Sequence, residues 1–96
     1  MFIIMINYKK PIEVVEQHVT EHRSFIEQCM HDHYFVAAGP KVPRTGGVII
    51  SQMTNRDQLS ALLEQDPFFI HDIADFEITE FIPVKHHEDF ASFISE

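Results

Sequence analysis

Apolar residues recur with the period of a helix along the segment 12–30. They are spaced by alternating steps of three and four residues, and the set comprises Ile12, Val15, Val19, Ile26 and Cys29. This spacing places them on one face of an amphipathic helix. His22 occupies the one position of that face that is not apolar. The sequence therefore predicts a helix over 12–30 that turns one imidazole toward the core.

Four shorter segments have the patterns of β-strands, and they cover residues 2–8, 34–38, 48–53 and 76–82. The first is an almost continuous apolar run, typical of a strand buried on both faces, whereas the last alternates apolar and acidic residues. The intervening loop 39–47 contains three glycines and two prolines. Because this loop is too short for a crossover helix, we expect the second and third strands to form a hairpin.

A second helix is predicted from Thr54, as the N-cap, to about Gln65. Asp57 lies near a capping-box position, and the buried face is formed by Leu59, Leu62 and Leu63. Asp66 precedes Pro67, and a residue before proline avoids the helical region, so the helix should end there. A short helical turn over 68–72 and a short terminal helix over 88–95 complete the prediction.

The resulting order of elements, βαββαβ, predicts an α+β fold of the ferredoxin-like class, with an antiparallel sheet and two helices on one face. We expect one domain over 1–96, with a core of about 2–84 and a C-terminal extension of about 85–96. The other face of the sheet would expose apolar side chains of the first two strands. A second copy of the sheet would cover them, so the pattern predicts a homodimer.

Charge and composition exclude several classes of function. The formal net charge is −8 and the seven basic residues are scattered, which argues against binding to nucleic acid or to an anionic membrane surface. The chain has one cysteine, so it has no internal disulfide. The N-terminal apolar run has no basic leader and is too short for a signal segment or a membrane span. These features predict a cytoplasmic protein.

His22 and Asp66 are the candidate catalytic residues. A carboxylate that accepts a hydrogen bond from one ring nitrogen fixes the tautomer of the imidazole and leaves the other nitrogen free for a substrate proton. If the two helices are neighbours on the sheet, both side chains can reach one cleft. The alternative is a structural one, in which His22 bonds a backbone carbonyl and Asp66 caps a turn.

The loop between the second and third strands carries Lys41 and Arg44, two cations that could bind an anionic substrate. The alternative is that they belong to a solvent-facing connector. With Gly39 and Pro40 in the loop and Phe68 after Asp66, they form the predicted substrate-binding set.

Two histidine-rich stretches invite a metal interpretation, and they contain His31 with His33 and His86 with His87. Adjacent rings diverge, and a zinc site needs three or four donors that the fold holds together. We therefore expect solvated residues at the ends of elements. The sequence has no glycine-rich phosphate loop and no nucleophile elbow, and it predicts no cofactor and no metal.

The combination of His22 on the first helix, the run Ala38-Gly39-Pro40, a third strand led by glycine and the run Asp66-Pro67-Phe68 resembles the YCII (YciI-like) family over about 2–84. The resemblance implies a ferredoxin-like fold that pairs as a dimeric α+β barrel. It also implies that His22 and Asp66 form an active-site dyad. Related barrels include muconolactone isomerases, and one branch of the family eliminates chloride from a chlorinated hydroxyhydroquinone.

The chain departs from the family pattern three residues before His22. Many members carry an arginine there, whereas this chain has Val19, so Arg23 and Arg44 are the candidates to replace it. The resemblance predicts an enzyme without a cofactor that moves a proton in isomerisation, elimination or lactone chemistry on a small anionic molecule. The alternative is a dimer that binds or senses a small ligand without turnover. A pocket that holds His22 within hydrogen-bond reach of Asp66 favours the enzyme.

Overall fold

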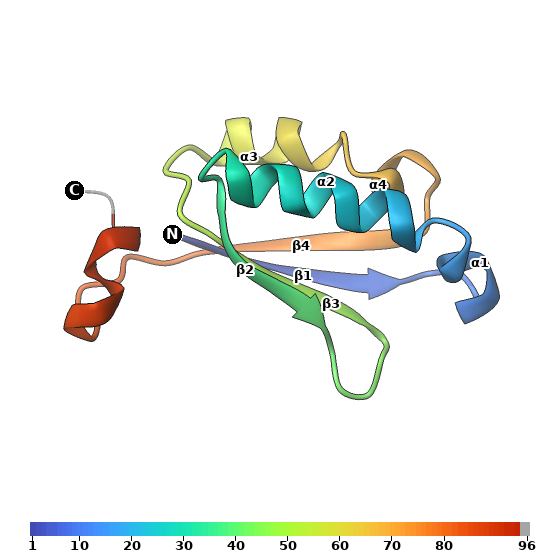
Figure 1. Ribbon diagram of the computed structural model, residues 1–96, viewed down its shortest axis with the longest axis horizontal. Coiled ribbons are helices and arrows are strands. Elements are labelled where there is room, and N and C mark those ends of the chain that lie inside the picture. Colours follow the sequence, from blue (N-terminus) through green and yellow to red (C-terminus); the bar gives the residue numbers. More distant parts are fainter. Residues whose placement is uncertain (95–96) are drawn as a thin grey trace.

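Four strands form one antiparallel sheet in the order β2-β3-β1-β4 (Figure 1). In the computed structural model, which describes residues 1–94, they are β1 (Phe2–Tyr8), β2 (Phe35–Pro40), β3 (Gly46–Ser51) and β4 (Ala74–Glu80). Strand β1 lies between β3 and β4 and pairs with both, and β2 pairs with β3 at the edge of the sheet. The predicted ferredoxin-like α+β fold is confirmed.

Three of the four α-helices, α2 (Val19–His31), α3 (Arg56–Leu63) and α4 (Pro67–Ile70), cover one face of this sheet, and α1 (Ile12–Glu16) lies at its end (Figure 1). A 3₁₀ helix, η1 (Glu88–Phe93), follows β4 at the opposite end from α1. The last predicted helix thus starts where expected, and Ser95 lies outside the described residues. No helix within residues 1–94 is long and apolar enough to cross a membrane.

The predicted helix over 12–30 is two helices. The chain turns at Gln17 and His18, whose amides donate to carbonyls only three residues back, at 3.2 and 3.0 Å. Such tight bonds end α1 and redirect the chain before α2 begins. Ile12 is therefore 41% exposed instead of part of the core. The apolar period survives the turn because Val15 and Val19, on either side of it, are both buried.

The ends of four further elements also differ from the prediction. Strand β2 continues through Gly39 to Pro40, because β2 is an edge strand and a proline at its end costs few ladder bonds. Helix α3 is capped by Asn55 instead of Thr54, and the Asn55 side chain accepts from the Gln58 amide at 2.9 Å. Strands β3 and β4 each begin and end two residues earlier than predicted.

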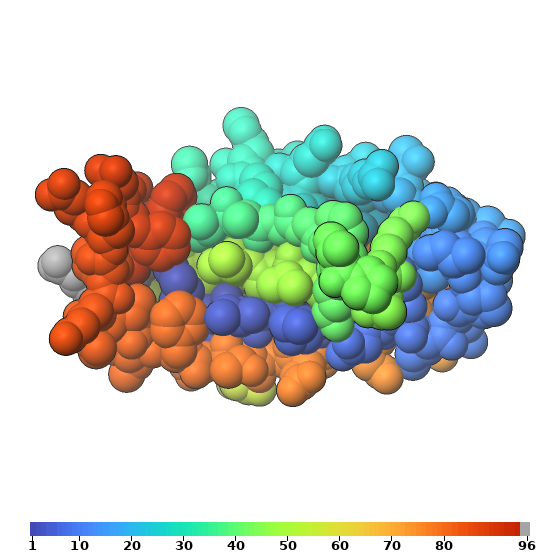
Figure 2. Space-filling model, turned by 90° about the horizontal axis from the view of Figure 1, so that it is seen from below, coloured from blue at the N-terminus to red at the C-terminus, as the bar shows by residue number. Residues whose placement is uncertain are grey.

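The core lies between the sheet and the helices. Phe2, Ile4 and Ile6 point from β1 toward the helices and are at most 2% exposed. Their neighbours Ile3 and Met5 point to the opposite face and are half-buried. Figure 2 shows this second face, which is formed by the strands and lies opposite the face that α2, α3 and α4 cover in Figure 1. The period of two along β1 thus leaves an apolar face of the sheet without a helix over it in the described part of the chain.

Glycine is required where β3 begins. A Cβ atom on Gly46 would lie 1.7 Å from the carbonyl oxygen of Ile6, and the φ angle of Gly46 is 158°. Any side chain there would push β3 away from β1. Gly46 therefore keeps the loop end of the β2–β3 hairpin close to β1, on the side where the candidate site is found.

Candidate functional site

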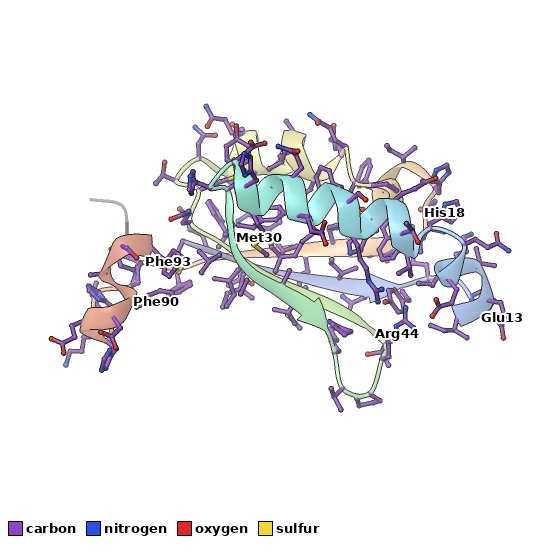
Figure 3. The ribbon with its side chains drawn as sticks, in the orientation of Figure 1. Glu13, His18, Met30, Arg44, Phe90 and Phe93 are labelled. Atoms are coloured by element: carbon purple, nitrogen blue, oxygen red, sulfur yellow. The ribbon has the colours of Figure 1, made fainter. Side chains whose placement is uncertain are left out.

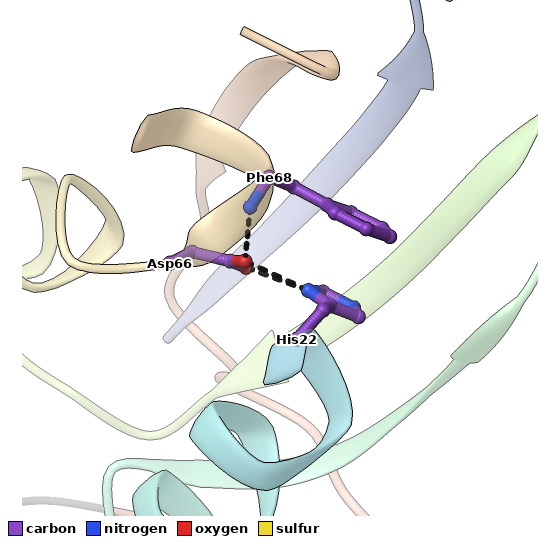
Figure 4. A network of polar contacts seen from close by, with 3 residues as sticks. All are labelled: His22, Asp66 and Phe68. Atoms are coloured by element: carbon purple, nitrogen blue, oxygen red, sulfur yellow. Dashed lines mark hydrogen bonds and ion pairs between the residues drawn. The ribbon is translucent and has the colours of Figure 1, made fainter. Parts of the chain in front are cut away.

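His22 and Asp66 meet between α2 and α4 (Figure 4). The Nδ1 atom of His22 lies 2.8 Å from Oδ1 and 2.9 Å from Oδ2 of Asp66. The His22 side chain is 16% exposed and the Asp66 side chain is fully buried. The pair spans 44 residues of sequence, so it exists only because α2 and α4 pack side by side on the sheet.

Asp66 has a structural role as well as its contact with His22. It is the N-cap of α4, with an extended backbone, and its Oδ1 accepts a hydrogen bond from the Phe68 amide at 2.9 Å. Pro67 occupies the first turn, where its missing N–H costs nothing. The same carboxylate therefore caps α4 and contacts His22, and the capping hydrogen bond fixes the direction of its oxygens.

This arrangement assigns the tautomer of His22. A carboxylate is an acceptor only, so the ring proton belongs on Nδ1 when it faces Asp66. In the neutral imidazole, Nε2 is then the atom with a free lone pair. Among the residues that the structure describes, Nε2 has no hydrogen-bond partner, and it is not one of the buried unpartnered atoms. It is available to a ligand.

The Phe68 ring packs against one face of the His22 imidazole. The two rings are stacked, with centroids 3.9 Å apart and planes within 3° of parallel. Phe68 is 2% exposed and also meets Tyr8 edge to face, at 5.9 Å. A side chain fixed by one hydrogen bond and one ring stack keeps a single orientation, as proton transfer requires.

A pocket of about 310 Å³ lies beside the imidazole, between α2 and the β2–β3 hairpin. It is lined by His22 and by four of the five residues of the predicted substrate-binding set, namely Gly39, Pro40, Arg44 and Phe68. Lys41 does not line it, because its ammonium donates to Oδ1 of Asn7 at 2.6 Å. A cavity of this volume is at the small end of ligand sites.

Arg44 belongs to the hairpin loop and reaches α1 (Figure 3). Its guanidinium donates to the carboxylate of Glu16, and this bond is the main reason that the pKa of Arg44 is raised above its ordinary value, with Tyr8 adding to it. The side chain remains 37% exposed. Arg44 is thus a permanent cation at the edge of the pocket, already paired with one carboxylate.

Several pocket residues were not assigned to it from sequence, and they include Ile6, Tyr8, Glu27 and Met30. Tyr8 could have been assigned to the pocket from the sequence, since it is an aromatic residue with a hydroxyl group at the end of a buried strand. Arg23, the other candidate to replace the family arginine, also lines the pocket, and so does Val19. The pocket therefore has two arginines and one glutamate at an otherwise mainly apolar wall.

The histidines at the ends of elements are exposed, as the sequence suggested. His31 is the last residue of α2, His33 follows that helix, and His86 lies in the segment before η1. His87 caps η1, where its Nδ1 accepts from the Asp89 amide at 3.1 Å. None of these four belongs to a group of three potential metal ligands within residues 1–94.

Comparison with known proteins relates the chain to one family. A family model described as the YCII-related domain matches residues 1–82. Among solved structures, the chain is similar to 5-chloro-2-hydroxyhydroquinone dehydrochlorinase from Burkholderia phenoliruptrix AC1100, in complex with 2,5-dihydroxybenzoquinone. The two are 17% identical, with a TM-score of 0.71 over 93% of this chain and 98% of the other. No curated protein sequence matches the chain significantly.

Proposed function

Because the chain belongs to the YCII-related family, we propose that it is a small enzyme that uses His22 as a general acid and base and needs no cofactor. The observation that carries the proposal is the geometry of His22. Its Nδ1 is bonded to a buried carboxylate, and its ring borders a pocket in which Nε2 is free. This is the arrangement that proton transfer at neutral pH requires.

The proposed reaction begins when Nε2 of His22 removes a proton from the substrate. The proton comes from a carbon atom or a hydroxyl group that lies next to a carbonyl or phenol group of the same molecule. Asp66 stabilises the imidazolium that forms, and it does not itself take the proton. In an isomerisation, Nε2 returns the proton to another atom of the substrate. In an elimination, the electron pair left by the proton forms a double bond and expels the leaving group with its bonding pair. Neither course needs an oxidant or a reductant.

The pocket favours a substrate with a single oxygenated ring. Its volume of about 310 Å³ suits a molecule of that size, and its walls are mainly apolar. Arg44 and Arg23 supply positive charge at the pocket for a carboxylate or phenolate. To bind it, Arg44 would exchange its contact with Glu16 for one with the substrate. The ring bound by the structural neighbour, 2,5-dihydroxybenzoquinone, is of the same class.

We also propose that the protein is a homodimer and that it acts in the cytoplasm. The apolar face of the sheet that carries Ile3 and Met5 supports face-to-face pairing, because burying such a face is the usual reason for association. The single cysteine, which is buried, suits a reducing compartment. Light scattering coupled to size exclusion tests the first part directly.

The test of the enzyme proposal compares the wild type with His22→Asn on a panel of hydroxylated and chlorinated quinols, lactones and dienoic acids. An asparagine amide can donate to Asp66 as Nδ1 does, but it has no atom in place of Nε2. We expect the variant to fold and bind the ligand while turnover falls by about 10²–10⁴-fold. Ligand binding without turnover by the wild type would favour the alternative, a ligand-binding or regulatory dimer. Equal turnover by both proteins would rule out His22 as the base.

A further inference from the structure

A second polar contact joins α2 to α4, away from the pocket. His18, the N-cap of α2, stacks on His71, the C-cap of α4, with ring centroids 4.2 Å apart and planes 23° from parallel. Glu21, in the first turn of α2, completes the group. One ligand atom from each residue lies within 4.8 Å of the others. None of the three lines the pocket beside His22.

One atom of this group lacks a partner. The Nδ1 atom of His18 is buried and makes no hydrogen bond, and it is the single buried side-chain nitrogen or oxygen of which this is true within residues 1–94. A ring nitrogen removed from water without a replacement partner is destabilising, and folded proteins seldom keep one. The atom therefore points to a ligand that supplies the missing bond.

We propose that His18, Glu21 and His71 bind a divalent transition-metal ion, for which Zn²⁺ is the natural probe. Two imidazoles and one carboxylate are the donors that zinc and its neighbours prefer, and three protein ligands leave a fourth position for water. Asp72, the next residue after His71, is bonded to Lys9 and so does not fill that position. The site is distinct from the dyad of His22 and Asp66.

Metal binding requires one side chain to turn. The lone pair of an imidazole lies in the plane of its ring, so two nearly parallel stacked rings do not aim at a common point. His71 and Glu21 are exposed and can rotate, whereas His18 is held at the turn between α1 and α2. In the bound state His71 leaves the stack and presents its ring edge to the ion. The ion then links α2 to α4, the two elements that also carry His22 and Asp66.

The experiment uses the full chain, stripped with a chelator and then titrated with ZnCl₂ by calorimetry, with thermal unfolding as a second readout. We expect one Zn²⁺ per chain and a Tm that rises by several degrees, because binding to the folded state alone stabilises it. His71→Ala and Glu21→Gln change exposed residues, so both should fold. We expect His71→Ala to weaken binding at least about tenfold, since even outer contacts of metal sites cost that much.

Two controls locate the site. The double variant His86→Ala/His87→Ala removes two exposed imidazoles near the C-terminus, and His22→Asn removes the imidazole of the dyad. Both should bind Zn²⁺ as the wild type does. The proposal is overturned if the wild type takes up no Zn²⁺ at millimolar concentration, if His71→Ala binds as tightly as the wild type, or if either control abolishes binding.

Discussion

Two contacts between α2 and α4 lie one helical turn apart, and they differ in how far they are buried and satisfied. At the inner contact, the dyad of His22 and Asp66, the carboxylate is fully buried and accepts from both the His22 ring and the Phe68 amide. The outer contact is the group of His18, Glu21 and His71. Its Glu21 and His71 side chains are exposed, and Nδ1 of His18 has no partner. The same pair of helices thus carries one fixed contact and one that can rearrange.

Burial accounts for the difference. A carboxylate without access to water must be paired and hydrogen-bonded, so the position of Asp66 leaves His22 and the α4 cap little freedom. Exposed side chains have water as an alternative partner, so the outer group can adopt several arrangements at small cost. A group that must move a proton benefits from the first situation, and a group that closes on an added ion benefits from the second.

Removing the carboxylate of the dyad should have the largest effect on stability. Asp66→Ala deletes the cap of α4 and leaves Nδ1 of His22 without its partner. We expect the free energy of unfolding, from urea denaturation, to fall by about 3 kcal/mol. Asp66→Asn, which keeps a capping oxygen, should lose less. If Asp66→Ala lowers the free energy of unfolding by less than about 1 kcal/mol, the contact between His22 and Asp66 does not stabilise the fold more than the outer contact does.

The same substitution at His22 on α2 and at His18, the N-cap of α2, should have different effects. His22→Leu restores a continuous apolar face but leaves the buried Asp66 with the Phe68 amide alone, so we expect a loss of about 2 kcal/mol. His18→Leu removes an unpartnered nitrogen and should leave the melting temperature unchanged or raise it, in buffer with a chelator. Thermal unfolding of both variants decides the comparison. Equal losses would contradict it.

Cys29, buried on α2, reports whether the dyad holds this helix on the sheet. Burial raises the pKa of its thiol to about 11 from an ordinary 9.0, with the charges of Asp32 and Asp66 adding to the effect. At pH 8 the thiolate fraction is then about 100-fold below that of a free thiol. We expect labelling by a disulfide reagent to be slow in the wild type and faster in Asp66→Ala. Urea-unfolded protein is the control, and rapid labelling of the native wild type would contradict the prediction.

The smallest effect is expected beyond the outer contact, at Asp72. Its hydrogen bond from Lys9 holds the pKa of the Asp72 carboxyl below 3.8 and raises the pKa of Lys9. The lowered pKa stabilises the fold above the unfolded value, and this contribution is lost as the pH falls through the folded value. Asp72→Asn keeps a residue that tolerates the positive φ of 54°.

We therefore expect Asp72→Asn to lower Tm slightly at pH 7 in low salt. The difference from the wild type should shrink with added salt, because both groups are exposed and screened. It should disappear in acid, because protonation of the Asp72 carboxylate removes its charge from the wild type as well. Thermal melts over a range of pH and salt measure it. A difference that grows as the pH falls would show that the sign is wrong.

Local patterns were sufficient for most of the fold. The spacing of three and four residues placed His22 on the inner face of its helix, and that inference survived the unpredicted turn at Gln17 and His18. The turn was missed because the apolar period runs through it. The run Asp66-Pro67-Phe68 correctly marked the end of one helix and the start of another short one, since proline restricts its neighbour and suits a first turn.

The sequence by itself therefore determined the fold class and most of the elements, and it marked His22 and Asp66 as candidates, because hydrophobic period and proline chemistry act over a few residues. Only the tertiary structure decided which side chains meet. It placed Asp66 within 2.8 Å of His22, turned Lys41 away from the pocket toward Asn7, and stacked His18 on His71. Such contacts join residues far apart in the chain, and they depend on how helices pack on the sheet, which no local pattern encodes.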